Sequence, residues 1–402
     1  MQCARLHPGR ALCFAILHRS LQNFTSSHVR CHFFLHLNGL PHTGQVFSGN
    51  CCFFMAGGEG CTETGAGRRP DPIPGGAQPI PGYAAHGMTL RNAYLGSLVA
   101  DALAMPGHWY YDREALVRDY GILDRCKAPC NPHPDSILWR STYHPPDPRG
   151  DILREQAVYW GLRGIHYHQF LEAGENTLNF RLATDLHEQV RDSGRYDFMR
   201  WAERYVARML QPGWHRDTYL EEYHRGFFTR YAQGKRITKC GISDEHIGGL
   251  AQVPALLAAL PEGADWRGSV KEHVALTHRH GNVLRAADCL ARLLKSVIAG
   301  TPLREAIARE AGDWFSCRKA EQWARRRDLE IIGQVISPAC YIDQAFPAAL
   351  YLSWKYHDDF DAGIIANAMV GGDNCHRGAV VGSLLAAANG IDTRWIIGLK
   401  CK

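Results

Sequence analysis

Helical periodicity fills the chain beyond Met88, and this pattern limits the fold more than any other feature. In "LRNAYLGSLVADALAMP", apolar side chains from Leu90 to Leu98 recur on one face, and Pro106 with Gly107 ends the pattern. The same period recurs in "TLNFRLATDLHEQV", "FMRWAERYVARML", "LTHRHGNVLRAADCLARLLKSVIAG", "AFPAALYLSWKYH" and "DFDAGIIANAMV". Alternating strand patterns and long internal repeats are missing from the sequence. We therefore predict an all-α fold: one compact domain with helices crossing at orthogonal and other angles.

Composition narrows the class of protein and its partners. The chain has 402 residues, of which 46% are apolar and 21% charged, and its formal net charge is +5. That charge is small for the length, so we expect no nucleic-acid partner. The most apolar run near the N-terminus, residues 11–17, is far shorter than the roughly 18 residues that span a bilayer. We therefore expect no membrane partner.

The cysteines indicate a reduced, intracellular protein. Six of the fourteen lie in the first 61 residues, and the other eight are scattered without a repeated C-x-x-C pair. Cys126 and Cys130 in "CKAPC" are expected to be free thiols in a loop, with a zinc pair as the alternative.

The first 86 residues are expected to be a leader followed by a linker. Residues 1–58 contain arginine but no Asp or Glu, and residues 65–83 are rich in Pro and Gly. Three interpretations stay open: an organellar transit peptide, an over-extended gene with its true start at Met88, or a secretory signal. We place the helical domain at residues 87–402, in the mitochondrion or chloroplast if the leader is real and otherwise in the cytoplasm.

A proline-rich stretch, residues 129–148, interrupts the helical pattern. It contains six prolines together with Trp139 and Tyr143. Structureless loops of this length are uncommon in compact domains unless they bind something or are disordered. We expect an ordered loop that covers or walls a site.

Two glycine-preceded helix starts carry oxygen ligands. In "MVGGDNCHRGAVVGSLLAAANG", paired glycines end one helix and Asp373 begins the next, where a simple capping role is the alternative. In "AGENTLN", Glu175, Asn176 and Thr177 follow a glycine in the same way. If the two helix starts face each other, they form a site for a hard cation. Nearby softer ligands are His166, His168, Cys375 and His376.

The helix that begins after Asp373 has small residues on one face. Gly378, Gly382 and Ala386 recur every four residues, so another helix backbone can approach closely there. We expect the opening helix, around residues 94–98, to be that partner.

Four segments resemble the ADP-ribosylglycohydrolase family, all-helical enzymes that use paired Mg²⁺ ions. "YLGSLVADALAMP" is similar to the family's opening helix, with Asp101 on its Asp. "AGENTLN" takes the place of the T-D-D-T metal motif, and "GGDNCHRG" lies within a block similar to the one that carries G-G-D-x-D-T. "LTHRHGNVLRAADCLARLLKSVIAG" is similar to a further family helix. The resemblance covers about residues 89–390 and implies the family's all-α fold.

The metal motifs depart from the family pattern. Of the four carboxylates that the resemblance calls for, only Glu175 and Asp373 are present. Two carboxylates do not neutralise two Mg²⁺ ions, and an uncompensated buried charge is costly. We therefore expect one Mg²⁺ or Mn²⁺, or Zn²⁺ as the alternative, bound by Glu175, Asn176, Thr177, Asp373 and His376; a metal-free site also stays open.

The resemblance also implies roles in catalysis and substrate binding. Glu175 is the expected catalytic base, and Asp373 shares the catalytic role as a metal ligand. The expected substrate contacts, each with a capping or structural alternative, are Asp101, His246, Gly248, Gly249 and Asp343.

These residues predict a hydrolase that cleaves an N-glycosidic bond with metal assistance. The expected partner is an ADP-ribosylated protein or an ADP-ribose-like small molecule. One alternative is a non-catalytic relative that binds ADP-ribose or has a structural role. Another is a helical metalloprotein of different chemistry, built on Glu175 and histidines.

Overall fold

The structure is a computed structural model that describes residues 89–400. The predicted leader and linker, including the transit-peptide interpretation, lie outside the described residues. The helical domain is therefore described from Thr89 onward.

The prediction of an all-α fold is confirmed. Within residues 89–400, β-structure is limited to isolated bridges such as His246 with Tyr341. No helix of this part of the chain is both long and apolar enough to cross a membrane. The α-helices are α3 Leu90–Ala104, α4 Arg113–Tyr120, α5 Leu178–Ser193, α6 Phe198–Leu210, α7 Glu222–Ala232, α8 Val253–Ala259, α9 Trp266–Thr277, α10 Gly281–Ile298, α11 Leu303–Glu310, α12 Cys317–Trp323, α13 Asp328–Ile331, α14 Ile342–Lys355, α15 Phe360–Met369, α16 Asn374–Asn389 and α17 Thr393–Ile397. Short 3₁₀ helices are η1 Met105–Gly107, η2 Leu138–Arg140, η3 Pro148–Gly150, η4 Arg154–Tyr159, η5 Ile237–Lys239 and η6 Ile247–Leu250.

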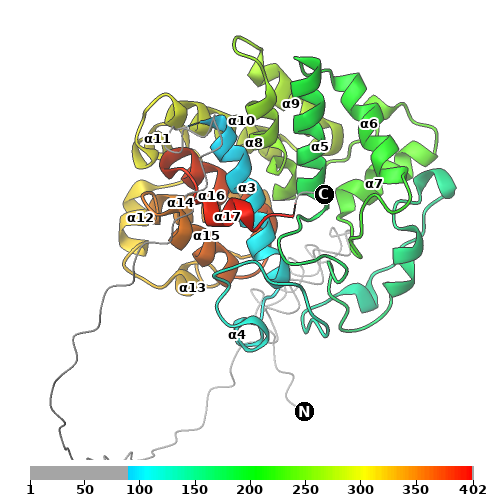
Figure 1. Cartoon of the computed structure of the whole chain (residues 1–402), viewed down its shortest axis with the longest axis horizontal. Helices are drawn as coiled ribbons and strands as arrows, with labels where there is room; N and C mark the ends of the chain where they lie inside the picture. The colour runs from blue at the N-terminus through cyan, green and yellow to red at the C-terminus, as the bar shows by residue number, and fades with distance from the viewer. Residues whose placement is uncertain (1–88, 401–402) are drawn as a thin grey trace, which may run out of the picture. The chain divides into compact units, whose positions relative to one another are not determined.

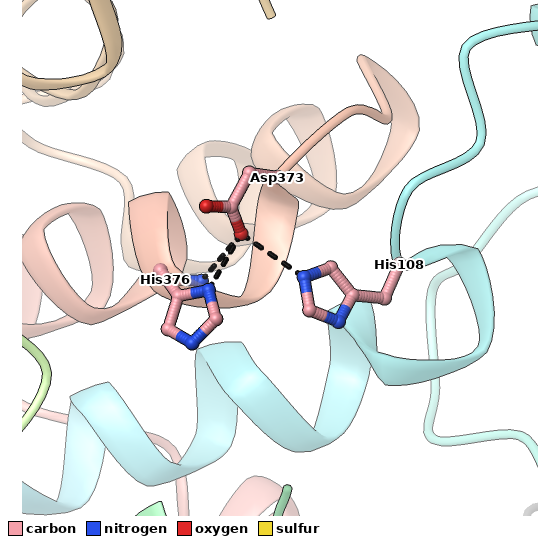
Figure 2. A group of neighbouring side chains, drawn as sticks. All are labelled: His108, Asp373 and His376. Carbon is pink, nitrogen blue, oxygen red and sulfur yellow. Dashed lines mark hydrogen bonds and ion pairs between the residues drawn. The ribbon is translucent and has the colours of Figure 1, made fainter. Parts of the chain in front are cut away.

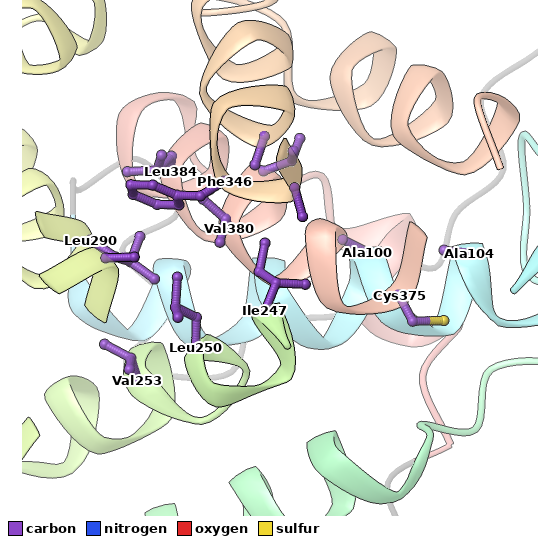
Figure 3. Packing of buried hydrophobic residues seen from close by; sticks show 14 of the residues in the cluster. Ala100, Ala104, Ile247, Leu250, Val253, Leu290, Phe346, Cys375, Val380 and Leu384 are labelled. Atoms are coloured by element: carbon purple, nitrogen blue, oxygen red, sulfur yellow. The ribbon is translucent and has the colours of Figure 1, made fainter. Parts of the chain in front are cut away.

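The paired helices α3 and α16 form the centre of the fold (Figure 1). A Cβ atom built at Gly382 would overlap the backbone of Gly96 and lie 2.7 Å from the Cβ of Ala100. The predicted close approach of the small-residue face to the opening helix is therefore confirmed. Because both helices present backbone to each other, side chains from α8, α10 and α14 close the core around them (Figure 3).

The stretch "LTHRHGNVLRAADCLARLLKSVIAG" is not one continuous helix. Helix α9 ends at Thr277, and α10 begins at Gly281. Between them the backbone bridges to Ile242: the Ile242 N–H donates to the Thr277 carbonyl at 3.0 Å, and the Arg279 N–H donates to the Ile242 carbonyl at 2.7 Å. Hydrogen bonds to a remote segment override the local helical pattern here.

The proline-rich loop 129–148 packs against the segment after α3. His133 Nε2 donates to the carbonyl oxygen of His108 at 2.9 Å. Asp135 accepts the backbone N–H groups of Tyr111 at 2.6 Å and Asp112 at 2.8 Å. The loop therefore supports the backbone that carries His108.

Acid should weaken the fold partly through His273, which is buried on α9 beside Trp201. Burial lowers the pKa of His273 from 6.5 to about 3. Between these pH values the unfolded chain therefore binds a proton at this residue and the folded chain does not. Stability from the neutral ring is present above pH 6.5 and is lost as the pH falls toward 3. We expect His273→Phe to reduce the stability lost between pH 7 and pH 5 by about 2 kcal/mol, measured by urea unfolding at both pH values. An unchanged pH dependence would contradict this.

Candidate functional site

A double-glycine turn positions the start of α16. Gly371 and Gly372 both adopt positive φ, at 61° and 64°. The Trp109 N–H donates to the Gly372 carbonyl at 2.8 Å, and the Gly372 N–H donates to the Tyr110 carbonyl at 2.7 Å. Side chains would clash with Tyr110 and Pro338 at this turn, so glycine is required at both positions. The turn therefore joins the start of α16 to the segment that follows α3.

This junction places Asp373 among three histidines. Its Oδ1 lies 3.0 Å from His108 Nε2 and 2.7 Å from His376 Nδ1 (Figure 2). Its Oδ2 lies 3.5 Å from His246 Nε2. Asp373 also caps α16, accepting the backbone N–H of His376 at 3.4 Å. The predicted capping alternative and a functional role are therefore compatible at this residue.

The charges in this centre are strongly coupled. Burial opposes ionisation of Asp373, but His376, His246 and a hydrogen bond from His108 hold its pKa well below the usual value. Burial also opposes a charge on His376, yet attraction to Asp373 and then to Glu221 raises its pKa to about 9. Burial lowers the pKa of His108 well below 6.5 despite its hydrogen bond to Asp373. The centre therefore holds an Asp373–His376 ion pair beside a neutral His108.

A chain of hydrogen bonds leads away from Asp373. His108 Nδ1 lies 2.7 Å from His168 Nε2, and His168 Nδ1 donates to Asp217 Oδ1 at 2.6 Å. All three residues are buried, with Asp217 2% exposed. The rings of His108 and His168 are nearly parallel, with an interplanar angle of 2°. Asp373 and Asp217 are thus joined through two imidazoles.

Two groups of buried side chains in the described chain could hold a metal ion. The first is His108, Asp373 and His376, and the second is His246, Cys340 and Asp373. In each group the ligand atoms lie within 4.8 Å of one another. In the second group, however, His246 Nδ1 accepts the Gly248 N–H at 2.9 Å, which favours a proton on Nε2, the atom that faces Asp373. The first group is therefore the better candidate metal centre.

Asp101 on α3 anchors the start of α5. Its two carboxylate oxygens accept the Asn176 side-chain amide at 2.9 Å, the Thr177 N–H at 2.8 Å and the Thr177 hydroxyl at 2.8 Å. The Asp101 carbonyl also lies 3.8 Å from Cys375 Sγ in α16. Asp101 therefore contacts both helix starts that the sequence singles out.

We expect Asp101→Ala to destabilise the fold by about 2 kcal/mol or more, because each buried donor left without an acceptor costs about 1–3 kcal/mol. Urea unfolding measures the change. Asp343→Ala is the control, since that carboxylate is exposed and accepts a surface hydrogen bond from Asn282. Equal stabilities for the two variants would contradict the anchoring role.

Glu175 lies at a different place, in the wall of a cavity. Arg216 pairs with its carboxylate, which also accepts the Glu172 N–H at 2.7 Å. The cavity has a volume of about 270 Å³. Its polar lining consists of Glu175, Asn176, Arg181, Thr184, Asp185, Glu188, Arg208, Arg216, Asp217 and Lys400, and Trp214 and Leu171 add apolar surface. Asp217 thus belongs both to this cavity and to the chain that ends at Asp373.

A family profile for ADP-ribosylglycohydrolase matches residues 88–400. The chain belongs to the ADP-ribosylglycohydrolase family. Among solved structures, an ADP-ribosylglycohydrolase-related protein complex is similar to this chain, with 20% sequence identity and a TM-score of 0.49 over 78% of this chain and 93% of the other. A search of the curated proteins found no match.

Family membership supports a glycohydrolase-type function. ADP-ribosylglycohydrolases act on ADP-ribosylated substrates in general, and the family together with the two buried side-chain groups indicates a divalent metal. In this member, Asp373 and His376 lie together in the first group, whereas Glu175 belongs to neither group. Asn176 and Thr177 make their contacts with Asp101.

The other predicted site residues lie in varied surroundings. His246 faces Asp373, and the buried Gly248 packs against the Tyr223 hydroxyl. Gly249 packs against Val283 and His278. Asp343 is exposed in the first turn of α14.

Two of the softer ligands also make contacts outside the metal groups. His166 Nε2 donates to the Pro106 carbonyl at 3.0 Å. Cys375 is buried against α3. Neither belongs to the two groups found in the described chain.

Sequence reasoning missed His108, Asp217 and Cys340. His108 directly follows the Pro-Gly stop of the opening helix in "MPGHWYY", so a polar residue at a helix end was the only local signal. Asp217 and Cys340 lie in irregular segments without a recognisable spacing. Their partners are remote in sequence, which explains why no local pattern marks them.

Proposed function

We propose that this protein is a hydrolase that cleaves the N-glycosidic bond of an ADP-ribose-like substrate with the help of one divalent metal ion. The substrate would be an ADP-ribosylated protein or an ADP-ribose-like small molecule. Membership of the ADP-ribosylglycohydrolase family supports the reaction class. The observation that carries the proposal is the hydrogen-bonded chain from cavity-lining Asp217 to the Asp373 centre.

The residues at the Asp373 centre fit a metal ion. Among the described residues, Asp373 Oδ2 is buried without a hydrogen-bond partner, and its neighbour His246 Nε2 lies 3.5 Å away. Such an atom is costly unless a cation or another donor satisfies it. Asp373 and His108 would hold the ion, and His376, the third member of this group, would join them only after giving up its proton. When bound, a divalent ion supplies electrostatic stabilisation and polarises the ribose oxygens or a water molecule.

The cavity residues supply binding and positioning. Arg181 lies over the Trp214 ring at 5.1 Å, and Arg216 fixes the carboxylate of Glu175. Guanidinium groups bind phosphate oxygens through paired N–H donors, so Arg181 and Arg216 suit the diphosphate of ADP-ribose. Glu175 is the proposed base, because its carboxylate is held in the wall of the same cavity.

A second candidate function is ADP-ribose binding without catalysis. Asp373, His108 and His376 each have 0% exposed surface, so a substrate reaches them only if the surrounding segments move. Glu175 is already engaged by Arg216. Both observations favour a relative that kept the fold and the cavity but lost the reaction.

Release of free ADP-ribose separates the two functions. The full chain, loaded with divalent metal, is incubated with peptides ADP-ribosylated on arginine or on serine, and binding of ADP-ribose is measured by calorimetry. Release that is lost in Glu175→Gln supports the hydrolase. Binding without release supports the second function, and the absence of both overturns both candidates.

A further inference from the structure

We propose that an exposed patch on the connection between α4 and α5 docks an acidic segment of a protein substrate that also carries apolar side chains. This inference rests on the proposed function, in which a protein or a small molecule carries the ADP-ribose-like group, and it selects the protein. The helices of this connection are the short 3₁₀ helices η2, η3 and η4 (Figure 1). The docking patch consists of Trp139, Val158, Tyr159, Leu162, Arg163 and Phe170.

The docking patch gathers apolar side chains that are exposed to solvent. Among the described residues, ten large apolar side chains are exposed, and four of them belong to the patch. These four are Trp139, Val158, Leu162 and Phe170. Single exposed apolar residues are common on protein surfaces, whereas a contiguous group of them marks a binding surface.

Contacts between η2 and a later turn make the patch contiguous. The Gly161 N–H donates to the Leu138 carbonyl at 2.8 Å, which holds the turn of residues 159–162 beside Trp139. The guanidinium carbon of Arg163 lies 3.8 Å from the centre of the Trp139 ring. Trp139 and the turn therefore form one surface, although about twenty residues separate them in the sequence.

A second ring contact extends this surface. The rings of Tyr159 and Phe170 meet edge to face, with their centres 5.4 Å apart. The Leu162 N–H donates to the Tyr159 carbonyl at 3.2 Å, which closes the turn. Tryptophan, tyrosine, phenylalanine and arginine are the side chains that protein–protein interfaces contain in excess. The composition of the patch therefore favours a protein partner.

The charge of the patch indicates the kind of protein segment that it binds. Residues 138–146 and 156–171, which form the patch, contain Arg140 and Arg163 but no Asp or Glu. Among the described residues, the Arg163 side chain has no hydrogen bond or ion pair. Stacking on Trp139 occupies the face of its guanidinium and leaves the in-plane N–H donors for a carboxylate. An acidic segment with apolar side chains is therefore complementary to the patch.

The docking patch shares its supporting backbone with the wall of the cavity. The Trp160 ring N–H donates to the Thr218 carbonyl at 2.8 Å, and Thr218 directly follows Asp217. Phe170 of the patch directly precedes Leu171. Asp217 and Leu171 both line the cavity. A protein whose modified side chain enters the cavity would thus meet the patch with the residues that flank that side chain.

Binding of ADP-ribosylated peptides tests this inference. The full chain carries Glu175→Gln, so that a bound peptide is not cleaved. One peptide has Glu and Leu on both sides of a modified arginine or serine, and a second has Lys in place of each Glu. Fluorescence anisotropy measures peptide binding, and calorimetry measures binding of free ADP-ribose. We expect the acidic peptide to bind at least tenfold more tightly than the lysine peptide, and the difference to shrink as the salt concentration rises.

Reversing the charge at Arg163 should reverse this preference. Arg163→Glu should lower the affinity for the acidic peptide at least tenfold and raise the affinity for the lysine peptide, with unchanged affinity for free ADP-ribose. A merely structural role of Arg163 would not raise the affinity for the lysine peptide. Arg285→Glu is the matched control, because Arg285 is an exposed arginine on α10 that lies over the Trp314 ring at 5.4 Å.

The apolar part of the patch has its own variant. Leu162→Ser should lower the affinity for the acidic peptide about tenfold, because the leucine can no longer be buried against the partner. Leu329→Ser is the matched control, since Leu329 on α13 is 43% exposed and Leu162 is 48% exposed. Both control variants should bind the two peptides as the parent does.

Several results would overturn the inference while the proposed function stands. They are equal affinities of the two peptides for the parent, or a loss of affinity in either control as large as in its patch variant. Dimerisation, or binding of anionic lipid vesicles, that Leu162→Ser abolishes would assign the patch to a second copy or a membrane if the peptides bind equally. The expected peptide preference without ADP-ribose release by the chain with Glu175 overturns only the hydrolase function. The absence of any peptide binding overturns both proposals.

Discussion

Gly382→Ala is expected to lower the free energy of unfolding by about 3 kcal/mol, at the upper end of the range for overpacked cores. The added methyl group would overlap the backbone of Gly96 in α3 and would lie 2.7 Å from Ala100 Cβ. Neither neighbour has a flexible side chain that can turn away. The two central helices would have to separate, and the side chains packed around both would lose contacts.

Chemical unfolding of the variant and the parent measures this effect. Gly281→Ala is the matched control, because Gly281 begins α10 and a Cβ atom there meets nothing within 4 Å. Alanine is the better helix former, so the control should be neutral or slightly stabilising. If Gly382→Ala were as stable as Gly281→Ala, the close approach of α3 and α16 would be wrong.

The central helix pair could be predicted because its information is local. Glycine and alanine at four-residue spacing mark one face of a helix, and paired glycines before Asp373 mark where that helix begins. Pro106 and Gly107 mark where α3 ends in the same way. The break between α9 and α10 could not be predicted, since it depends on backbone hydrogen bonds to Ile242.

The candidate site was only partly predictable for a similar reason. Asp373 and His376 lie three residues apart in one helix turn, so a local motif includes both. His108 meets Asp373 across 265 positions of sequence, and His168 meets Asp217 across 49. The double-glycine turn, packed between Tyr110 and Pro338, and the Asn374 side chain, which donates to the Gly107 carbonyl at 3.1 Å, bring His108 to the start of α16.

Where the sequence departs from the family's metal motifs, other side chains of this protein contact the motif residues. Where this sequence lacks motif carboxylates, Asn176 and Thr177 instead donate hydrogen bonds to Asp101. Glu175 is balanced by Arg216, and Asp373 by His376. Side-chain cations and neutral donors thus compensate carboxylates of this chain without any bound ion. At most one divalent ion is then needed, at Asp373, whose Oδ2 has no hydrogen-bond partner among the described residues.

Asp373→Ala is expected to cost about 3–5 kcal/mol of stability, because it breaks a buried ion pair and leaves one charge uncompensated. The remaining partner, His376, has 0% exposed surface and a pKa of about 9 only because Asp373 and then Glu221 outweigh the opposing effect of burial. Without Asp373 the ring must give up its proton or carry a buried charge. Urea unfolding at pH 7 measures the loss, and Asp343→Ala, an exposed carboxylate, should change stability by less than about 0.5 kcal/mol.

The pH dependence of stability tests whether the Asp373–His376 ion pair causes this loss. The folded-state pKa of His376 is raised from 6.5 to about 9, so its contribution to stability is fully present below pH 6.5 and is lost as the pH rises through 9. The parent protein should therefore lose stability between pH 6.5 and pH 9, and Asp373→Ala should lose much less over the same interval. A variant that is destabilised by the same amount at both pH values would show that Asp373 acts through packing or helix capping and not through the charge of His376.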